Sequence, residues 1–246
     1  MKKIALSIIV VFVAALSSSA QVFIDTNETY KPISIGLRFG GNTSNLSTNY
    51  ESVIPDMGWN HTQWRGGFTL GTVLDVRLRN FIALQTGLFV ETRSCRYHYL
   101  QASLVDDYMS AYDGEYESNY WQVPLMLSFR VNWGYSTVFV FDLGPYFAWG
   151  FGGDNAYSIY TTRGDDATDY DITQMKVDSD FFGKGGVAKS YDWGFKMGVG
   201  IELSEHYYIG AHYLAGCRNV MKQYPGFEGW VSGRNKAWSF TVGYNF

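Results

Sequence analysis

Histidine is the first residue type to consider for chemistry in this chain, because its imidazole titrates near neutral pH and can act as a general base. His98 lies near Asp106 and Asp107, and Ser94 and Ser103 flank it. A His/Asp pair beside a serine could support acyl transfer, but no spacing here identifies a nucleophile. The other histidines are His61, His206 and His212. We therefore expect no enzyme activity and assign no catalytic residue.

A second candidate is an acidic stretch that begins with RGDDATDYD. Its carboxylates are Asp165, Asp166, Asp169 and Asp171, followed by Asp178 and Asp180. Carboxylates at this density could hold a hard cation such as Ca²⁺. The spacing does not match an EF-hand loop, which needs a central Gly and a terminal Glu. A solvated acidic loop is the favoured interpretation, and no metal or cofactor is predicted.

The two cysteines, Cys95 and Cys217, could form a disulfide if the chain is exported. The strand pattern given below places Cys95 on the inward side of one strand and Cys217 on the outward side of another. This placement favours two unpaired thiols near strand ends.

Residues 1–20 are typical of a secretory signal peptide. Lys2 and Lys3 precede an apolar run over residues 4–16, and small residues follow it. The run is shorter than the roughly 20 residues of a spanning helix. We expect cleavage before Gln21, which leaves residues 21–246 as one domain. Loss of two lysines leaves 17 Lys and Arg against 23 Asp and Glu, a formal charge of −6 that argues against a nucleic-acid partner.

The mature chain contains eight segments in which large apolar residues alternate with small or polar ones, the period of a β-strand. Their predicted ranges are about 33–42, 64–78, 81–97, 120–133, 137–151, 190–203, 206–218 and 237–246. Short turns and long loops alternate between them. No other stretch resembles a transmembrane helix, so a spanning chain would need a closed barrel. The pattern predicts an all-β fold: an eight-stranded antiparallel transmembrane up-and-down β-barrel, with short periplasmic turns and long extracellular loops.

The polar positions decide which face points outward. They carry many glycines and charges of both signs, namely Arg38, Arg65, Asp75, Arg77, Glu91, Arg93, Arg130, Asp142, Asp192, Lys196 and Glu202. A soluble barrel such as a lipocalin would point this face to water and keep its apolar face inside. Glycine at this frequency would weaken an exterior face, whereas in a narrow interior it makes room for large side chains. We predict an interior charge network that fills the barrel.

Near the ends of the predicted strands, the apolar face carries aromatic residues, which favour the headgroup level of a bilayer. These predicted girdle residues are Trp64, Trp121, Trp133, Trp149, Trp193, Trp238 and Tyr244. The C-terminal Phe246 resembles the signal that the barrel-assembly machinery recognises. The expected location is therefore the outer membrane, with outer-membrane lipids, lipopolysaccharide and that machinery as partners.

Several segments resemble the PorT-like outer-membrane β-barrel domain, a family abundant in Bacteroidetes. The most recognisable is NYWQVPLMLSFR, through Tyr120, Val123, Pro124 and Leu125. ISIGLRFGGNTSNLS resembles the first strand of the family, and GPYFAWGFGG and FTVGYNF fit its later strands. The resemblance implies the barrel and its location but carries no catalytic residues. Some relatives are tied to protein secretion across the envelope.

Together these observations predict a non-enzymatic outer-membrane protein that acts through its extracellular loops as an envelope anchor or as a component of assembly, secretion or adhesion. One alternative is a small channel for ions or solutes, and another is a loop-borne lipid-modifying enzyme.

Overall fold

The computed structural model describes residues 31–49, 61–103, 108–133, 136–163, 177–222 and 232–246. The predicted signal peptide and the carboxylates of Asp165, Asp166, Asp169 and Asp171 lie outside these ranges. Within the ranges, no helix has the length and apolar character needed to cross a membrane.

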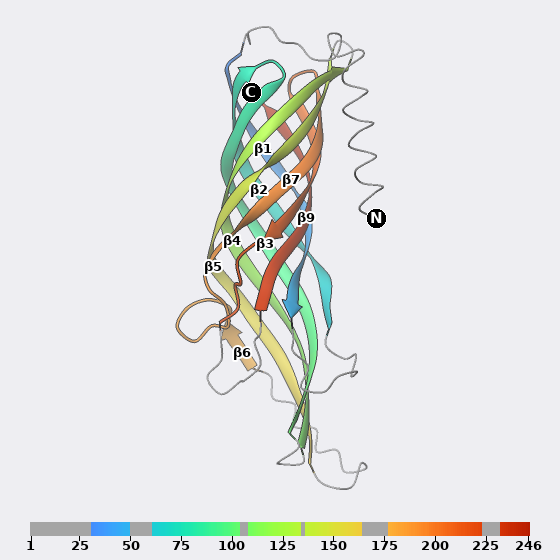
Figure 1. Ribbon diagram of the computed structural model, residues 1–246, viewed down its shortest axis with the longest axis vertical. Helices are drawn as coiled ribbons and strands as arrows, with labels where there is room; N and C mark the ends of the chain where they lie inside the picture. Colours follow the sequence, from blue (N-terminus) through green and yellow to red (C-terminus); the bar gives the residue numbers. More distant parts are fainter. Residues whose placement is uncertain (1–30, 50–60, 104–107, 134–135, 164–176, 223–231) are drawn as a thin grey trace.

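The regular structure consists of β-strands (Figure 1). Their bounds are β1 Ile33–Asn49, β2 His61–Arg79, β3 Ile82–Ser103, β4 Tyr108–Trp133, β5 Thr137–Arg163, β6 Val177–Asp180, β7 Tyr191–Leu203, β8 Tyr207–Gly216 and β9 Ser232–Asn245. All pairings between these strands are antiparallel.

Eight strands form a closed ring, and the short β6 lies outside it. Neighbours in the ring follow the order β1, β2, β3, β4, β5, β7, β8 and β9. The ring closes where β1 pairs with β9, from Gly36–Asn245 to Asn49–Ser232. β6 pairs with β5 only, over Asp154–Tyr157. The predicted eight-stranded up-and-down barrel is confirmed.

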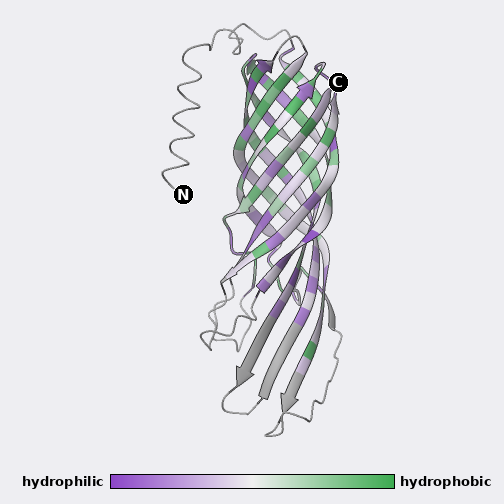
Figure 2. Cartoon of the chain, turned by 90° about the vertical axis from the view of Figure 1, so that its right-hand side faces the viewer, coloured by the Kyte–Doolittle hydropathy of each residue, from purple (hydrophilic) through white to green (hydrophobic). Residues whose placement is uncertain are grey.

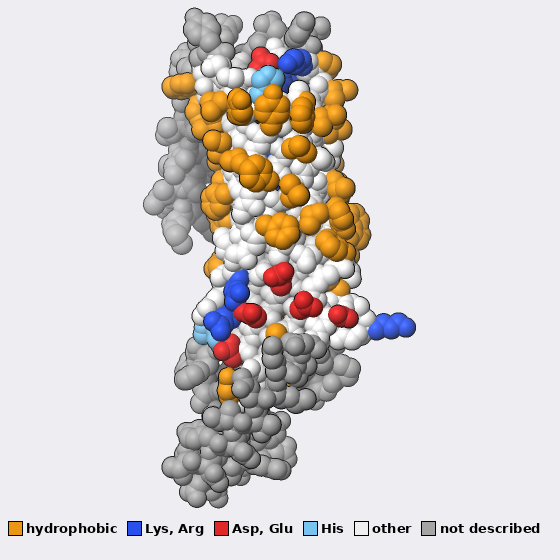
Figure 3. All heavy atoms as spheres, turned by 180° about the vertical axis from the view of Figure 1, so that it is seen from behind, with side chains coloured by type: hydrophobic (Ala, Val, Ile, Leu, Met, Phe, Trp, Pro, Cys, Tyr) orange, Lys and Arg blue, Asp and Glu red, His pale blue; other side chains and the backbone are white. Residues whose placement is uncertain are grey.

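The ring carries its apolar side chains outside and its polar side chains inside. In β1, the side chains of Leu37 and Phe39 are 48% and 60% exposed. On the opposite face of the same strand, Ser34 and Arg38 are 6% and 4% exposed. Figure 3 shows hydrophobic side chains spread over the wall of the barrel, with charged side chains gathered beyond them. A water-soluble protein buries its large aliphatic side chains. This inverted arrangement therefore requires an apolar medium around the wall.

Three neighbouring strands extend well past the predicted ranges. β3 continues to Ser103, β4 begins at Tyr108 and β5 continues to Arg163, so the loop predicted over 98–119 is wrong and is largely a β-hairpin. Figure 2 shows these strands leaving the barrel together. The reason is that apolar-out alternation marks only strands that face lipid, whereas backbone pairing continues beyond it: the outward positions Glu115 and Glu117 of β4 are polar, so the lipid pattern has ended while the strand goes on. We call this extension of β3, β4 and β5 the protruding sheet.

Candidate functional site

The interior near the short turns holds a cluster centred on Glu202. Its carboxylate accepts hydrogen bonds from Arg130 on β4 and from Arg77 on β2, the latter at 3.4 Å between Nη2 and Oε1. Glu202 and Arg130 are buried. Since an unpaired ion is costly to bury, three strands are tied together at this level by mutual charge compensation.

A second group surrounds the carboxylate of Asp142 on β5. Ser128 donates to one of its oxygens, and Nε2 of His212 lies 3.1 Å from the other. Tyr208 lies 3.5 Å from the same nitrogen. A serine nucleophile would need the imidazole beside its own hydroxyl. Here the carboxylate separates Ser128 from His212, so the group is a buried hydrogen-bond network without the geometry for acyl transfer.

Two other interior charges, Arg38 and Asp75, contact uncharged side chains. The guanidinium of Arg38 lies 4.1 Å from the ring centroid of Tyr208, and the amide of Gln85 donates to Asp75 at 2.9 Å. The sequence did not lead us to predict the contact between His212 and Tyr208. Their positions, four residues apart on the inward side of β8, could have indicated it.

Arg93 is the hub of the interior toward the protruding sheet. Its Nη1 lies 2.8 Å from Asp192 and its Nη2 lies 3.0 Å from Glu91. The guanidinium also lies 4.5 Å from the ring centroid of Tyr120 and 5.3 Å from that of Tyr146. All three ionic side chains are at most 1% exposed. Two carboxylates and two aromatic faces therefore enclose one cation.

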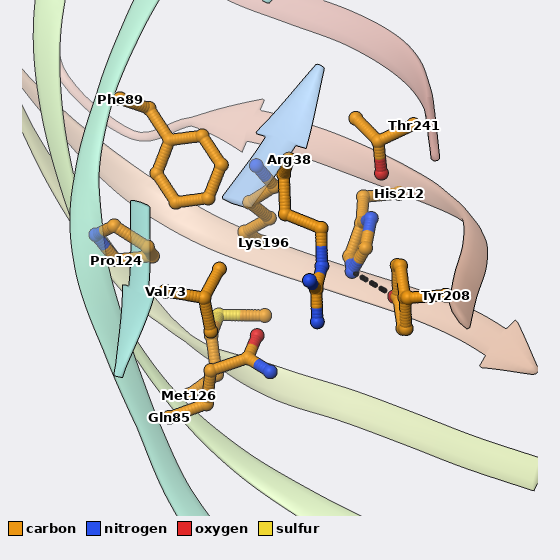
Figure 4. A pocket seen from close by; sticks show the side chains of 10 residues that line it. All are labelled: Arg38, Val73, Gln85, Phe89, Pro124, Met126, Lys196, Tyr208, His212 and Thr241. Atoms are coloured by element: carbon orange, nitrogen blue, oxygen red, sulfur yellow. Dashed lines mark hydrogen bonds between the residues drawn. The ribbon is translucent and has the colours of Figure 1, made fainter. Parts of the chain in front are cut away.

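Between these clusters lies a small cavity of about 20 Å³ (Figure 4). Its lining includes Lys196, whose ammonium lies 5.1 Å from the ring centroid of Phe89. The other lining residues are Arg38, Val73, Gln85, Pro124, Met126, Tyr208, His212 and Thr241. This volume accommodates about one water molecule. At this level the interior is therefore otherwise occupied by side chains.

An aromatic cap packs against the Arg93 hub through Tyr120. Phe181 stacks on Tyr116 with ring centroids 4.4 Å apart, and Phe182 meets the edge of Tyr120 at 5.3 Å. Phe182 also covers Gly150, where any Cβ atom would overlap its ring. Both phenylalanines are buried. They lie between the predicted strands at 137–151 and 190–203, where the only signal is two adjacent aromatic residues in an otherwise polar, Gly-rich segment.

Arg65 does not belong to the interior network, and that prediction is wrong. Its side chain is 44% exposed and pairs with Glu115 on β4. β2 and β3 change register between Trp64 and Thr69, so β2 carries one extra residue there. A bulge of this kind re-aims the side chains beyond it. Simple alternation from Phe68 therefore assigns Arg65 to the wrong face.

Of the candidate catalytic side chains, the structure describes those of His98 and Ser94, and these two do not meet. Nδ1 of His98 lies 3.2 Å from Oδ1 of Asp113, and the ring of His98 stacks on that of His61 with centroids 4.9 Å apart. Ser94 lies four residues away on the same extended strand, a separation of about 13 Å. Asp106 and Asp107 lie outside the described ranges, as does the side chain of Ser103.

The described residues also contain no group of three or more His, Cys, Asp or Glu side chains placed to hold a metal ion. Asp180 is exposed. The side chain of Asp178 is not described.

Both cysteines are unpaired: Cys95 is buried and Cys217 is exposed. The thiol of Cys95 lies 3.2 Å from Oδ1 of Asn45, and its Cα pairs with that of Trp64 in the aromatic girdle. Cys95 is therefore a packing residue of the interior cluster.

The predicted girdle residues all point outward. Their side chains are exposed over the wall: Trp64, Trp121, Trp133, Trp149, Trp193, Trp238 and Tyr244. Phe246 is exposed beside Tyr244, with ring centroids 5.3 Å apart.

Comparison with known proteins gives one family and several distant structures. The family described as outer membrane protein beta-barrel domain matches residues 19–222. The attachment invasion locus protein Ail of Yersinia pestis shares 14% identity at a TM-score of 0.38, covering 88% of this chain and 100% of its own. OprG of Pseudomonas aeruginosa shares 10% identity at 0.36, with coverages of 91% and 99%. Neisserial surface protein A shares 12% identity at 0.34, with coverages of 88% and 100%. No curated protein sequence matches the chain.

Proposed function

Because the chain belongs to the outer membrane protein beta-barrel domain family, we propose that it is a non-enzymatic integral outer-membrane protein that binds a partner protein through its extracellular strands. The partner role covers envelope anchoring, adhesion, or service to an assembly or secretion machinery. The PorT-like, Bacteroidetes-type assignment is part of this proposal and rests on the segments around Tyr120 and Pro124.

The protruding sheet is the observation that carries the proposal. β3 loses its β2 neighbour beyond the His61–His98 pair, and β5 loses its β6 neighbour beyond the Tyr157–Val177 pair. Among the described strands, none pairs with the outer edge of β3 over 99–103 or of β5 over 158–163. Such edges present unpaired N–H and C=O groups that an extended segment of another protein can join.

The filled interior favours this proposal over a channel. The Glu202 cluster, the Arg93 hub and the aromatic cap each occupy the barrel at a different level. We expect purified refolded protein to give no reproducible open state in a planar bilayer. A steady single-channel conductance would contradict this part of the proposal.

Shortening the protruding sheet should abolish partner binding while leaving the barrel intact. Tyr99 and Tyr112 are paired, so residues 100–111 can be replaced by Asn-Gly, a dipeptide that favours tight hairpins. Crosslinking in whole cells followed by purification should recover a partner with the wild type and lose most of it with this variant. Migration of unheated samples on a gel verifies that the barrel has folded.

A matched control keeps the sheet and changes only its tip. Ser103 and Tyr108 are also paired, so residues 104–107 can be replaced by the same Asn-Gly turn. This control should retain the partner. Equal recovery with the shortened sheet would contradict binding through these strands.

The absence of catalysis is tested separately. We expect a deletion strain to keep its lipid A unchanged. A change in lipid A that the wild type restores and His98→Ala does not would contradict the non-enzymatic proposal.

A further inference from the structure

Two cations of β9 and one from the segment after β8 lie just beyond the aromatic girdle. Trp238 belongs to the girdle, and its ring lies 4.8 Å from that of Tyr213 on β8. Lys236 and Arg234 follow on the same face of β9 at two-residue steps toward the extracellular side. Each step advances the chain by about 6–7 Å. The two side chains therefore lie successively farther above the girdle.

Arg218 joins these residues from the end of β8. Its guanidinium lies 5.0 Å from the ring centroid of Tyr191. The following segment returns alongside β9, because the N–H of Val220 donates to the carbonyl of Gly233 at 2.9 Å. The backbone next to Arg218 therefore runs beside the backbone next to Arg234 at this end of the barrel. We call Arg218, Arg234 and Lys236 the β8–β9 cationic patch.

The patch lacks the acidic partners that similar cations have elsewhere on the surface. Arg65 pairs with Glu115, and Arg96 pairs with Asp113 at 3.6 Å. No carboxylate of the described residues lies within ion-pair distance of Arg218, Arg234 or Lys236.

The exposed acids gather on another part of the ring. Glu117, Asp154 and Asp180 are direct cross-strand neighbours on β4, β5 and β6. The charge of the patch therefore remains available for an external anion.

The height of the patch indicates which anion it meets. Tryptophan and tyrosine rings favour the headgroup level, and the longer strand ends mark the extracellular side. Cations one or two steps above the rings then face the phosphates of the outer leaflet, and Arg and Lys are the usual ligands of phosphate. We propose that the β8–β9 cationic patch binds a phosphate group of an outer-leaflet lipid. This lipid site is separate from the protein-binding edges of the protruding sheet.

Removing the three charges together tests the proposal. The variant is Arg218→Gln, Arg234→Gln and Lys236→Gln, and the probe is diphosphoryl lipid A added to refolded protein in detergent. Binding is measured by native mass spectrometry. We expect the variant to bind roughly tenfold or more weakly than the wild type. Dephosphorylated lipid A should bind the wild type as weakly as the phosphorylated lipid binds the variant.

The control removes the same number of exposed cations elsewhere, through Arg65→Gln, Arg96→Gln and Lys184→Gln. It should bind lipid A like the wild type. Equal binding by both triple variants would overturn the site, as would equal binding of phosphorylated and dephosphorylated lipid. Inorganic phosphate should compete only weakly. Full competition at equal concentration would indicate a site for soluble anions instead of a lipid site.

Discussion

Replacing Arg93 by leucine is expected to lower the free energy of unfolding by about 3–5 kcal/mol, because the change leaves buried carboxylates without their counter-ion. Arg93 contacts both Glu91 and Asp192, and these two side chains are at most 1% exposed. Leucine cannot donate to either carboxylate. It also removes the cation from between the rings of Tyr120 and Tyr146.

The measurement is the urea midpoint of unfolding. The folded fraction at each urea concentration is read from the gel shift between unheated and heated samples. Arg65→Leu is the matched control, because Arg65 is also paired with a glutamate but is 44% exposed. An exposed pair contributes less than about 1 kcal/mol. Equal midpoints for the two variants would contradict the burial and pairing of Arg93.

Replacing Gly40 by alanine is the second change with a large expected effect. Gly40 pairs with Thr241 where β1 meets β9, the contact that closes the ring. A Cβ atom at this position would overlap the backbone carbonyl oxygen of Phe240. Backbone cannot move aside as a flexible side chain can, so we expect a loss of about 1–3 kcal/mol from overpacking.

Gly152→Ala provides the control, since a Cβ atom there meets nothing within 4 Å. Refolding yield into detergent micelles and the urea midpoint should both fall for Gly40→Ala and stay near wild type for Gly152→Ala. An unchanged midpoint for Gly40→Ala would show that the β1–β9 seam adjusts to the added methyl group.

Alternation was sufficient to predict the strands that lie inside the bilayer. It requires only that one face meets lipid and the other meets the interior, so Ile33 to Phe39 and Trp238 to Tyr244 could be assigned from residue type. It failed at Arg65 because an inserted residue shifts parity without changing composition. It also ended too early on β3, β4 and β5, because the outward positions there, such as Glu115 and Glu117, are no longer apolar.

The aromatic cap lay beyond sequence reasoning for a different reason. Phe181 and Phe182 are buried by Tyr116 and Tyr120, which are about 60 residues away in the chain. No local pattern marks such a contact, because it depends on where the segment before β7 crosses the mouth of the ring.

The strand period, the outward apolar face and the presence of interior charges of both signs can be predicted from the sequence, because they follow from residue type and the two-residue repeat. Which charges meet depends on the folded ring. Arg93 and Asp192 are separated by 99 residues, and Arg130 and Glu202 by 72. Their contacts are set by ring closure and strand register, which bring distant segments to one level of the barrel. The protruding sheet and the β8–β9 cationic patch have the same origin, since each depends on which strands become neighbours.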